Sequence, residues 1–214
     1  MARLSRQESQ NRTRELLVES ARTALASRGY SGASVDVIAE TAGFSKGAFY
    51  SNFDSKEAIF MELLRQHMAR EREELERILG DGTSTAALDT WLESLNRDAD
   101  WAVVAVELQL HARRSEAFAD AYQALNDAHR AALGVLLDQL FASAGRRPPA
   151  ASTEIAGALM ALANGLALQR RAAGEHHNAA DPSGPLIGLV LQGLIASAAP
   201  AATKRPRASE RRPS

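Results

Sequence analysis

The feature that most restricts how this chain can fold is a pair of short helical patterns on either side of Gly43. The first pattern is one apolar stripe at helical spacing (i, i+3, i+4, i+7), formed by Val35, Ile38, Ala39 and Ala42. Ser34 precedes the stripe and is placed to cap the helix, because its hydroxyl can accept from a backbone N–H that lacks a partner within the helix. Glycine tolerates positive φ at a helix end, so Gly43 predicts a sharp turn into a second helix. This is the pattern of a helix-turn-helix.

The second helix opens at Ser45 and has two distinct faces. Phe49 and Phe53 lie one helical turn apart and are predicted to be core residues. The outer face is left with Lys46, Gly47, Tyr50 and Asn52. A solvated helix rarely carries a tyrosine, a glycine and so few charges on its outer side, whereas a helix that lies against the DNA backbone has reason to. We therefore predict that this helix enters a DNA major groove.

These residues carry a family resemblance. The run from Gly43 to Ala58, GFSKGAFYSNFDSKEA, resembles the DNA-binding helices of the TetR family of transcriptional regulators. In that family a helix opening with Ser-Lys-Glu follows at once, as at Ser55-Lys56-Glu57, and segment 14–30 looks like the family's first helix and the loop after it. The resemblance covers roughly the first 60 residues, across three consecutive helices. The rest of the chain is similar to the family only in length, helical character and lack of cysteine.

The resemblance and the helix geometry together predict the DNA contacts. Lys46, in the first turn of the second helix, is a candidate donor to guanine O6/N7 or to phosphate, and Tyr50 matches the family's phosphate-contacting tyrosine. Lys56 opposes the dipole at the start of the next helix, so we expect an anionic partner for it. Asp36 departs from the basic residue frequent near this position in the family. The predicted DNA-binding residues are Ser34, Ser45, Lys46, Gly47, Ala48, Tyr50, Ser51, Asn52 and Lys56.

Charge is distributed unevenly along the 214 residues. Residues 1–56 carry a net charge of +2, residues 57–199 a net of −7 and residues 200–214 a net of +4, against −1 for the whole chain. A basic head on an acidic body fits a DNA-binding domain joined to one that does not bind DNA. We expect a flexible arm over 1–12, a helix-turn-helix domain over 13–58, an effector-binding and dimerisation domain over 59–199, and a disordered basic tail over 200–214.

Several protein classes are disfavoured by composition and motifs. The lack of cysteine excludes disulfides, a thiol nucleophile and thiolate metal sites, and suits a reducing cytosol. No apolar run approaches the ~20 residues of a membrane span and no secretory signal is present, so a cytoplasmic protein is expected. Neither G-x-S-x-G, H-E-x-x-H nor a glycine-rich phosphate loop occurs. We predict that the chain is not an enzyme and uses no cofactor; a helical enzyme built from scattered residues is the distant alternative.

The remaining sequence predicts an all-α fold of about nine helices, since no stretch alternates as a strand does. A long helix is expected over 55–79, with the charged run 70–74 on a solvated face. Gly145–Pro149 is expected to break the chain. Further helices are expected over 83–96, 101–114, 115–144, 154–173 (capped by Ser152 or Thr153) and 185–199.

The last two predicted helices are apolar on nearly every side. Such helices must be covered by their own fold or by a partner. Burial in a monomeric core is one reading; the resemblance implies a four-helix bundle with a second copy. A two-fold dimer would hold two recognition helices ~34–36 Å apart and so read a palindromic operator. The predicted interface residues are Ile155, Leu159, Leu162, Leu166, Leu189, Leu191, Leu194 and Ile195.

The helical body is expected to enclose a pocket if the family architecture holds. The candidate lining residues are Trp91, Trp101, Glu107, Leu108, His111, Phe118, Tyr122, Met160 and Asn164. The alternative is that most of these residues simply pack in the core. Glu107 and His111 lie one turn apart, but with no third ligand evident they predict no metal site.

The predicted function is a dimeric, sequence-specific transcriptional regulator. Repression, with release from a palindromic operator by a small apolar or amphipathic ligand, is what the resemblance implies. An activator, or a regulator that needs no ligand, is the alternative.

Overall fold

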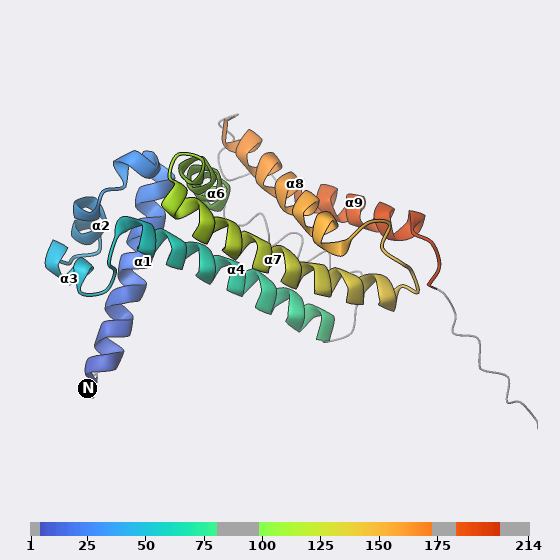
Figure 1. The fold of residues 1–214 in the computed structure, drawn as a ribbon, viewed down its shortest axis with the longest axis horizontal. Helices are drawn as coiled ribbons and strands as arrows, with labels where there is room; N and C mark the ends of the chain where they lie inside the picture. Colours follow the sequence, from blue (N-terminus) through green and yellow to red (C-terminus); the bar gives the residue numbers. More distant parts are fainter. Residues whose placement is uncertain (1–4, 81–98, 173–182, 202–214) are drawn as a thin grey trace, which may run out of the picture.

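The computed structural model describes residues 5–80, 99–172 and 183–201, and these parts are helical without a β-strand (Figure 1). The all-α prediction is confirmed. A single isolated bridge pairs Arg146 with Pro200. The described helices are α1 (Arg6–Gly32), α2 (Val35–Thr41), α3 (Lys46–Tyr50), α4 (Lys56–Gly80), α6 (Ala99–Ala112), α7 (Glu116–Ser143), α8 (Ser152–Ala172) and α9 (Ser183–Ser197). The helix expected over 83–96 lies outside the described residues.

The N-terminal helix begins earlier than predicted. Ser5 caps α1 in a reciprocal capping box: its hydroxyl accepts from the Glu8 N–H at 3.2 Å, and the Glu8 carboxylate accepts from the Ser5 N–H at 2.7 Å. Residues 6–12, expected in a flexible arm, are therefore helical. The prediction missed the Ser-x-x-Glu signal at positions 5–8.

The start of α8 also differs from the prediction. The helix begins at Ser152, so neither Ser152 nor Thr153 stands before its first turn as a cap. The Ser152 hydroxyl instead donates to the Asp138 carboxylate on α7 at 2.5 Å, which ties the two helices together. Gly134 of α7 lies at the same contact between the two helices. A Cβ at this position would lie 3.1 Å from the Thr153 nitrogen, so the lack of a side chain lets α7 and α8 approach closely.

The buried apolar side chains form two cores. The first joins α1–α4 with α6 and the start of α7, and its fully buried members include Leu17, Leu25, Ile38, Phe49 and Phe60. The second joins the end of α7 to α8 and α9 around Phe141, Ile155, Ile187 and Leu191. The helices α4 and α7 run side by side away from α1–α3, α8 packs along α7 and reaches α6, and α9 packs on α8 (Figure 1). None of the described helices is long and apolar enough to cross a membrane.

Candidate nucleic-acid interface and cavity

The turn between α2 and α3 has the predicted local chemistry. The Ser34 hydroxyl accepts from the Val37 N–H at 3.3 Å, and the Ser45 hydroxyl accepts from the Ala48 N–H at 3.2 Å, so each helix has a side-chain cap. Gly43 takes φ +79°, the left-handed conformation that glycine adopts most readily. These bonds set the angle at which α3 leaves α2.

The inner face of α3 is buried and its outer face is open. Phe49 is fully buried and Phe53 is 4% exposed, as predicted for core residues. Tyr50 is 51% exposed, and its ring meets the edge of Phe49. A Cβ added at Gly47 would contact only the Ser45 hydroxyl, at 3.7 Å, so packing within the described protein does not require glycine there. This leaves a shallow, accessible surface beside Tyr50.

Lys46 has a partner that the sequence analysis did not assign. Its ammonium forms an ion pair with Asp36 on α2 at 3.0 Å, and both side chains are exposed. The hydrogen bond to Asp36 raises the pKa of Lys46, so the ammonium stays charged. Asp36 thus stands beside the cation predicted to meet DNA and partly neutralises it.

The polar residues at the end of α3 are bonded back into the protein. The Ser51 hydroxyl donates to the Gly47 carbonyl at 2.9 Å, and the Asn52 amide donates to the Ala48 carbonyl at 2.8 Å. Arg14 of α1 donates to the Asn52 carbonyl and lies over the Phe53 ring at 4.2 Å. Arg14, which the predicted site omitted, therefore fastens α1 to the end of α3.

Lys56 turns away from the α3 face. Its ammonium donates to the Tyr30 carbonyl and lies 4.1 Å from the centre of the Tyr30 ring. Burial lowers the pKa of Lys56. The partner expected to be an external anion is here a carbonyl and an aromatic face of the same chain.

Tyr30 is the centre of a junction where α1, α4 and α6 meet. Its N–H donates to the Glu107 carboxylate and its hydroxyl donates to the Glu57 carboxylate, both at 2.7 Å. The His111 ring stacks on the Tyr30 ring with centroids 3.6 Å apart. Glu107 and His111 therefore hold the first core together rather than line a pocket. Leu108 and Phe118 are also buried in that core, at 0% and 3% exposure.

A cavity of about 120 Å³ lies in the helical body, bounded by α4, α6, α7, α8 and α9. Of the predicted pocket residues, Trp101, Tyr122, Met160 and Asn164 line it. Glu107, Leu108, His111 and Phe118 do not, for the reason just given, and Trp91 lies outside the described residues. The rest of the wall is largely aliphatic, with Leu64, Met68, Leu75, Leu133, Leu159 and Ile187 among its members.

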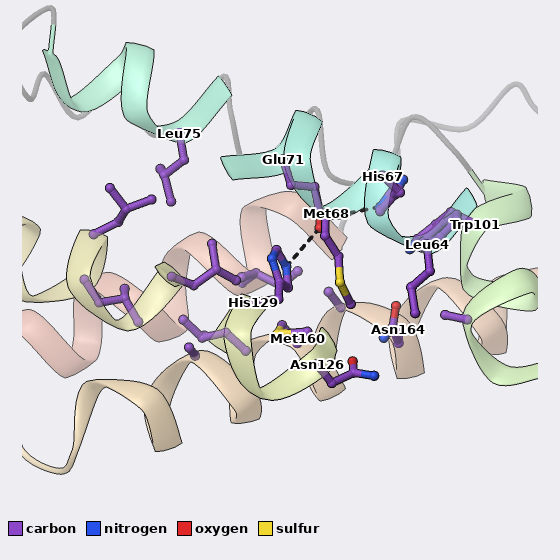
Figure 2. Close-up of a pocket in the computed structure, with 18 of the residues that line it drawn as sticks. Leu64, His67, Met68, Glu71, Leu75, Trp101, Asn126, His129, Met160 and Asn164 are labelled. Carbon is purple, nitrogen blue, oxygen red and sulfur yellow. Dashed lines mark ion pairs between the residues drawn. The ribbon is translucent and has the colours of Figure 1, made fainter. Parts of the chain in front are cut away.

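A polar cluster of His67, Glu71 and His129 faces this cavity (Figure 2). Glu71 lies 3.3 Å from His129 Nε2 and 3.6 Å from His67 Nε2, and the His67 ring stacks on Trp101 at 3.5 Å. Burial raises the pKa of Glu71, but the two imidazoles outweigh burial and lower it to about 2, so the carboxylate is ionised at neutral pH.

Glu71 thereby corrects the prediction of a solvated charged face over 70–74. It shares its helical stripe with Leu64, His67, Met68 and Leu75, and this spacing is the signal that could have found it. The His129 nitrogens and His67 Nε2 are buried without a hydrogen-bond partner among the described residues. Within that same part of the chain, no group of three acidic, histidine or cysteine side chains is arranged to hold a metal.

The predicted dimer residues differ in how far the chain itself buries them. Ile155 and Leu191 are 6% and 1% exposed, so the chain's own second core already covers them; the prediction that they face a partner is wrong. Leu159 lines the cavity. Leu162, Leu166, Leu194 and Ile195 are partly buried against the second core. Leu189 is 66% exposed, and its neighbours Leu186 and Val190 are each 44% exposed, so α9 presents an open apolar face.

Comparison with known proteins agrees with this architecture. Residues 17–63, which span most of α1, the helix-turn-helix and the start of α4, match the family model for "Bacterial regulatory proteins, tetR family". The repressor AcnR of Corynebacterium glutamicum is 31% identical over 106 residues, covering 50% of this chain and 54% of that protein. AcnR of Corynebacterium diphtheriae is 42% identical over 57 residues, covering 27% of this chain and 30% of the relative. The chain thus spans about half, or less, of the length of these curated relatives.

Solved structures share the fold over most of this chain. The fatty acid degradation regulator FadR of Bacillus halodurans aligns with a TM-score of 0.69 at 19% identity, over 86% of this chain and 95% of that one. Salmonella enterica GusR aligns with a TM-score of 0.68 at 20% identity, over 86% and 96% respectively. At this identity the likeness concerns the fold alone. The AcnR relatives are named as transcriptional repressors rather than enzymes, in keeping with the prediction that the chain is not an enzyme.

Proposed function

Because this chain belongs to the TetR family of bacterial regulatory proteins, we propose that it is a homodimeric transcriptional repressor that leaves a palindromic operator when a small ligand fills the cavity. The observation that carries this proposal is the outer face of α3. It offers an exposed Tyr50, a glycine that internal packing does not demand and a charged Lys46 on a helix whose other side is fixed in the core. Such a face can approach base edges while its tyrosine reaches the phosphates.

The DNA contacts that we propose are narrower than the predicted set. Lys46 and Tyr50 are the primary contacts. The small residues Gly47 and Ala48 let α3 approach the base edges closely, and Ser34 and Ser45, at the starts of α2 and α3, lie beside the DNA phosphates. The side chains of Ser51 and Asn52 donate hydrogen bonds within the protein, which must break before these groups can donate to DNA. Lys56 binds the Tyr30 carbonyl and so stabilises the domain instead of contacting DNA. The DNA-binding unit on this view is 6–58 and the effector and dimer unit is 59–199.

Fluorescence anisotropy on DNA fragments from beside the protein's own gene tests the proposal. Tyr50→Phe removes a phosphate donor and should weaken binding to every sequence by roughly tenfold, whereas Lys46→Ala should also reduce the preference for the operator. Arg65→Ala is the matched control, because Arg65 is likewise an exposed cation paired with a carboxylate, Glu62, but lies on α4 away from α3. Equal effects of all three variants would contradict a groove-reading role for α3.

A ligand-independent regulator is the rival within this class. The cavity between the helices favours a ligand, because well-packed interiors leave few voids larger than a water molecule. Ligand control requires that the ligand bind one dimer conformation better than the other. Operator release by a compound that fills the cavity, absent in a variant that cannot bind it, would separate the two.

A further inference from the structure

The cavity has a charge composition that constrains what can enter it. Among the lining residues in the ranges 5–80, 99–172 and 183–201, Glu71 is the one carboxylate, and none is a lysine or an arginine. The groups that compensate Glu71 are the two imidazoles of His67 and His129. A ligand head therefore meets a carboxylate whose partners are titratable, rather than a fixed cation.

The histidines do not turn the cluster into an anion site. One protonated imidazole beside Glu71 makes the cluster neutral, and a second positive charge in the same buried space is unfavourable. His129 is 4% exposed, so little water reaches its side of the cluster. A ligand carboxylate would thus bring a second negative charge into a low-dielectric site with no net positive charge to receive it.

A cationic head fits the same cluster without that cost. It can pair with Glu71 while both imidazoles stay neutral, so the buried charge remains balanced. His129 Nδ1, which has no hydrogen-bond partner among the described residues, can accept an N–H of the head, and Asn164, which faces the cavity from α8 (Figure 2), offers an amide oxygen. The aliphatic wall around Leu64, Met68 and Leu159 suits an apolar body.

We propose that the cavity binds a small amphipathic cation, with an ammonium head paired to Glu71 and an alkyl or aryl body against the aliphatic wall. This deepens the proposed function, since it takes the cavity as the effector site. The cavity, at about 120 Å³, is smaller than the roughly 300–1,000 Å³ typical of sites for drug-sized ligands, which points to a short body.

A series of ligands with one tail and three heads tests the proposal. Hexylammonium, hexanol and hexanoate are titrated into the full-length protein at neutral pH, with binding followed by calorimetry and by tryptophan fluorescence, to which Trp101 in the wall contributes. We expect hexylammonium to bind tightest and hexanoate weakest. Glu71→Gln keeps the shape but removes the charge, so it should weaken hexylammonium by at least roughly tenfold and leave hexanol within about twofold.

Glu73→Gln is the matched control, because Glu73 is an exposed glutamate on the same helix and does not line the cavity. Tighter or equal binding of hexanol or hexanoate, or no binding of any of the three, overturns the proposal. If Glu71→Gln does not fold, the order of affinities of the three ligands for the unaltered protein decides whether the proposal stands. The titrations contain no DNA, so a failure to find an operator would sink the proposed function and leave this assignment standing.

Discussion

At the scale of single residues, Lys56 is a cation that stabilises the fold through contacts within the chain rather than binding an external anion. A lysine in the first turn of a helix faces an unfavourable dipole, which made an external anion the natural expectation. In the structure the Tyr30 carbonyl and ring occupy the ammonium instead. The sequence could not reveal this, because Tyr30 and Lys56 are brought together only by the packing of α1 on α4.

Lys56→Met should therefore destabilise the protein. The substitution keeps the aliphatic stem but removes a charged hydrogen bond and a cation–π contact, for an expected loss of about 1–2 kcal/mol in the free energy of unfolding. Urea denaturation of the full-length protein measures it, with Lys46→Met as the exposed control that should change little. An unchanged unfolding free energy together with lost DNA binding would restore the phosphate-contact role.

Asp36 makes the opposite kind of prediction, a gain of affinity by removing a charge. Asp36→Asn frees Lys46 from its 3.0 Å ion pair and takes a negative charge away from the DNA-facing surface. Binding to any DNA should tighten by about two- to fivefold, with a steeper salt dependence. Glu62→Gln breaks the similar exposed pair with Arg65 and should leave DNA affinity unaltered. A weaker Asp36→Asn complex would mean that Asp36 orients Lys46 for its contact.

At the scale of the elements, helix positions were largely predictable and cross-helix partners were not. Caps and stripes are local, so Ser34, Ser45 and Gly43 could be placed from the sequence. The residues that line the pocket could not be predicted without knowing which neighbour each turn of α6 faces. Trp101 lines the cavity, whereas Glu107 and His111, a few turns further along the same helix, contact Tyr30. Glu71 was wrongly predicted to be solvated, because it lies within a run of charged residues although its own side chain faces the cavity.

The helix α6 thus touches both the cavity and the DNA-binding unit, and Glu107 is one of its contacts to the latter. Tyr30 follows Gly29, whose φ of +66° interrupts α1, and the freed Tyr30 N–H donates to the Glu107 carboxylate. Glu107→Ala should leave that N–H without its acceptor, costing about 1–3 kcal/mol, whereas Glu107→Gln keeps an acceptor and should cost less. Hydrogen exchange at the Tyr30 amide measures the loss directly. Equal protection in all three proteins would show that Glu107 does not hold the junction.

At the scale of the whole molecule, the apolar face of α9 predicts the assembly. Leu189 is 66% exposed beside two further exposed apolar residues, a patch that a soluble chain normally covers. Leu189→Glu should yield a particle near the 23.0 kDa of one chain in light scattering and weaken operator binding, because one chain supplies one recognition helix. Val135→Glu, at a similarly exposed position on α7, is the control. A dimeric Leu189→Glu protein would move the interface elsewhere.

The charge cluster of His67, Glu71 and His129 should influence how the whole molecule responds to acid. Glu71 has a folded-state pKa lowered to about 2 from an ordinary 4.5, so its contribution to stability is fully present above pH 4.5 and declines as the pH falls toward 2. In Glu71→Gln that contribution is absent at every pH, so the variant starts from a lower stability. The variant should therefore unfold at a higher pH than the unaltered protein, whereas Glu73→Gln, on the exposed side of α4, should not. Circular dichroism during acid titration gives the three midpoints. Coincident midpoints would mean that water, rather than the imidazoles, compensates the Glu71 charge, and a cationic ligand would then gain less from entering the cavity.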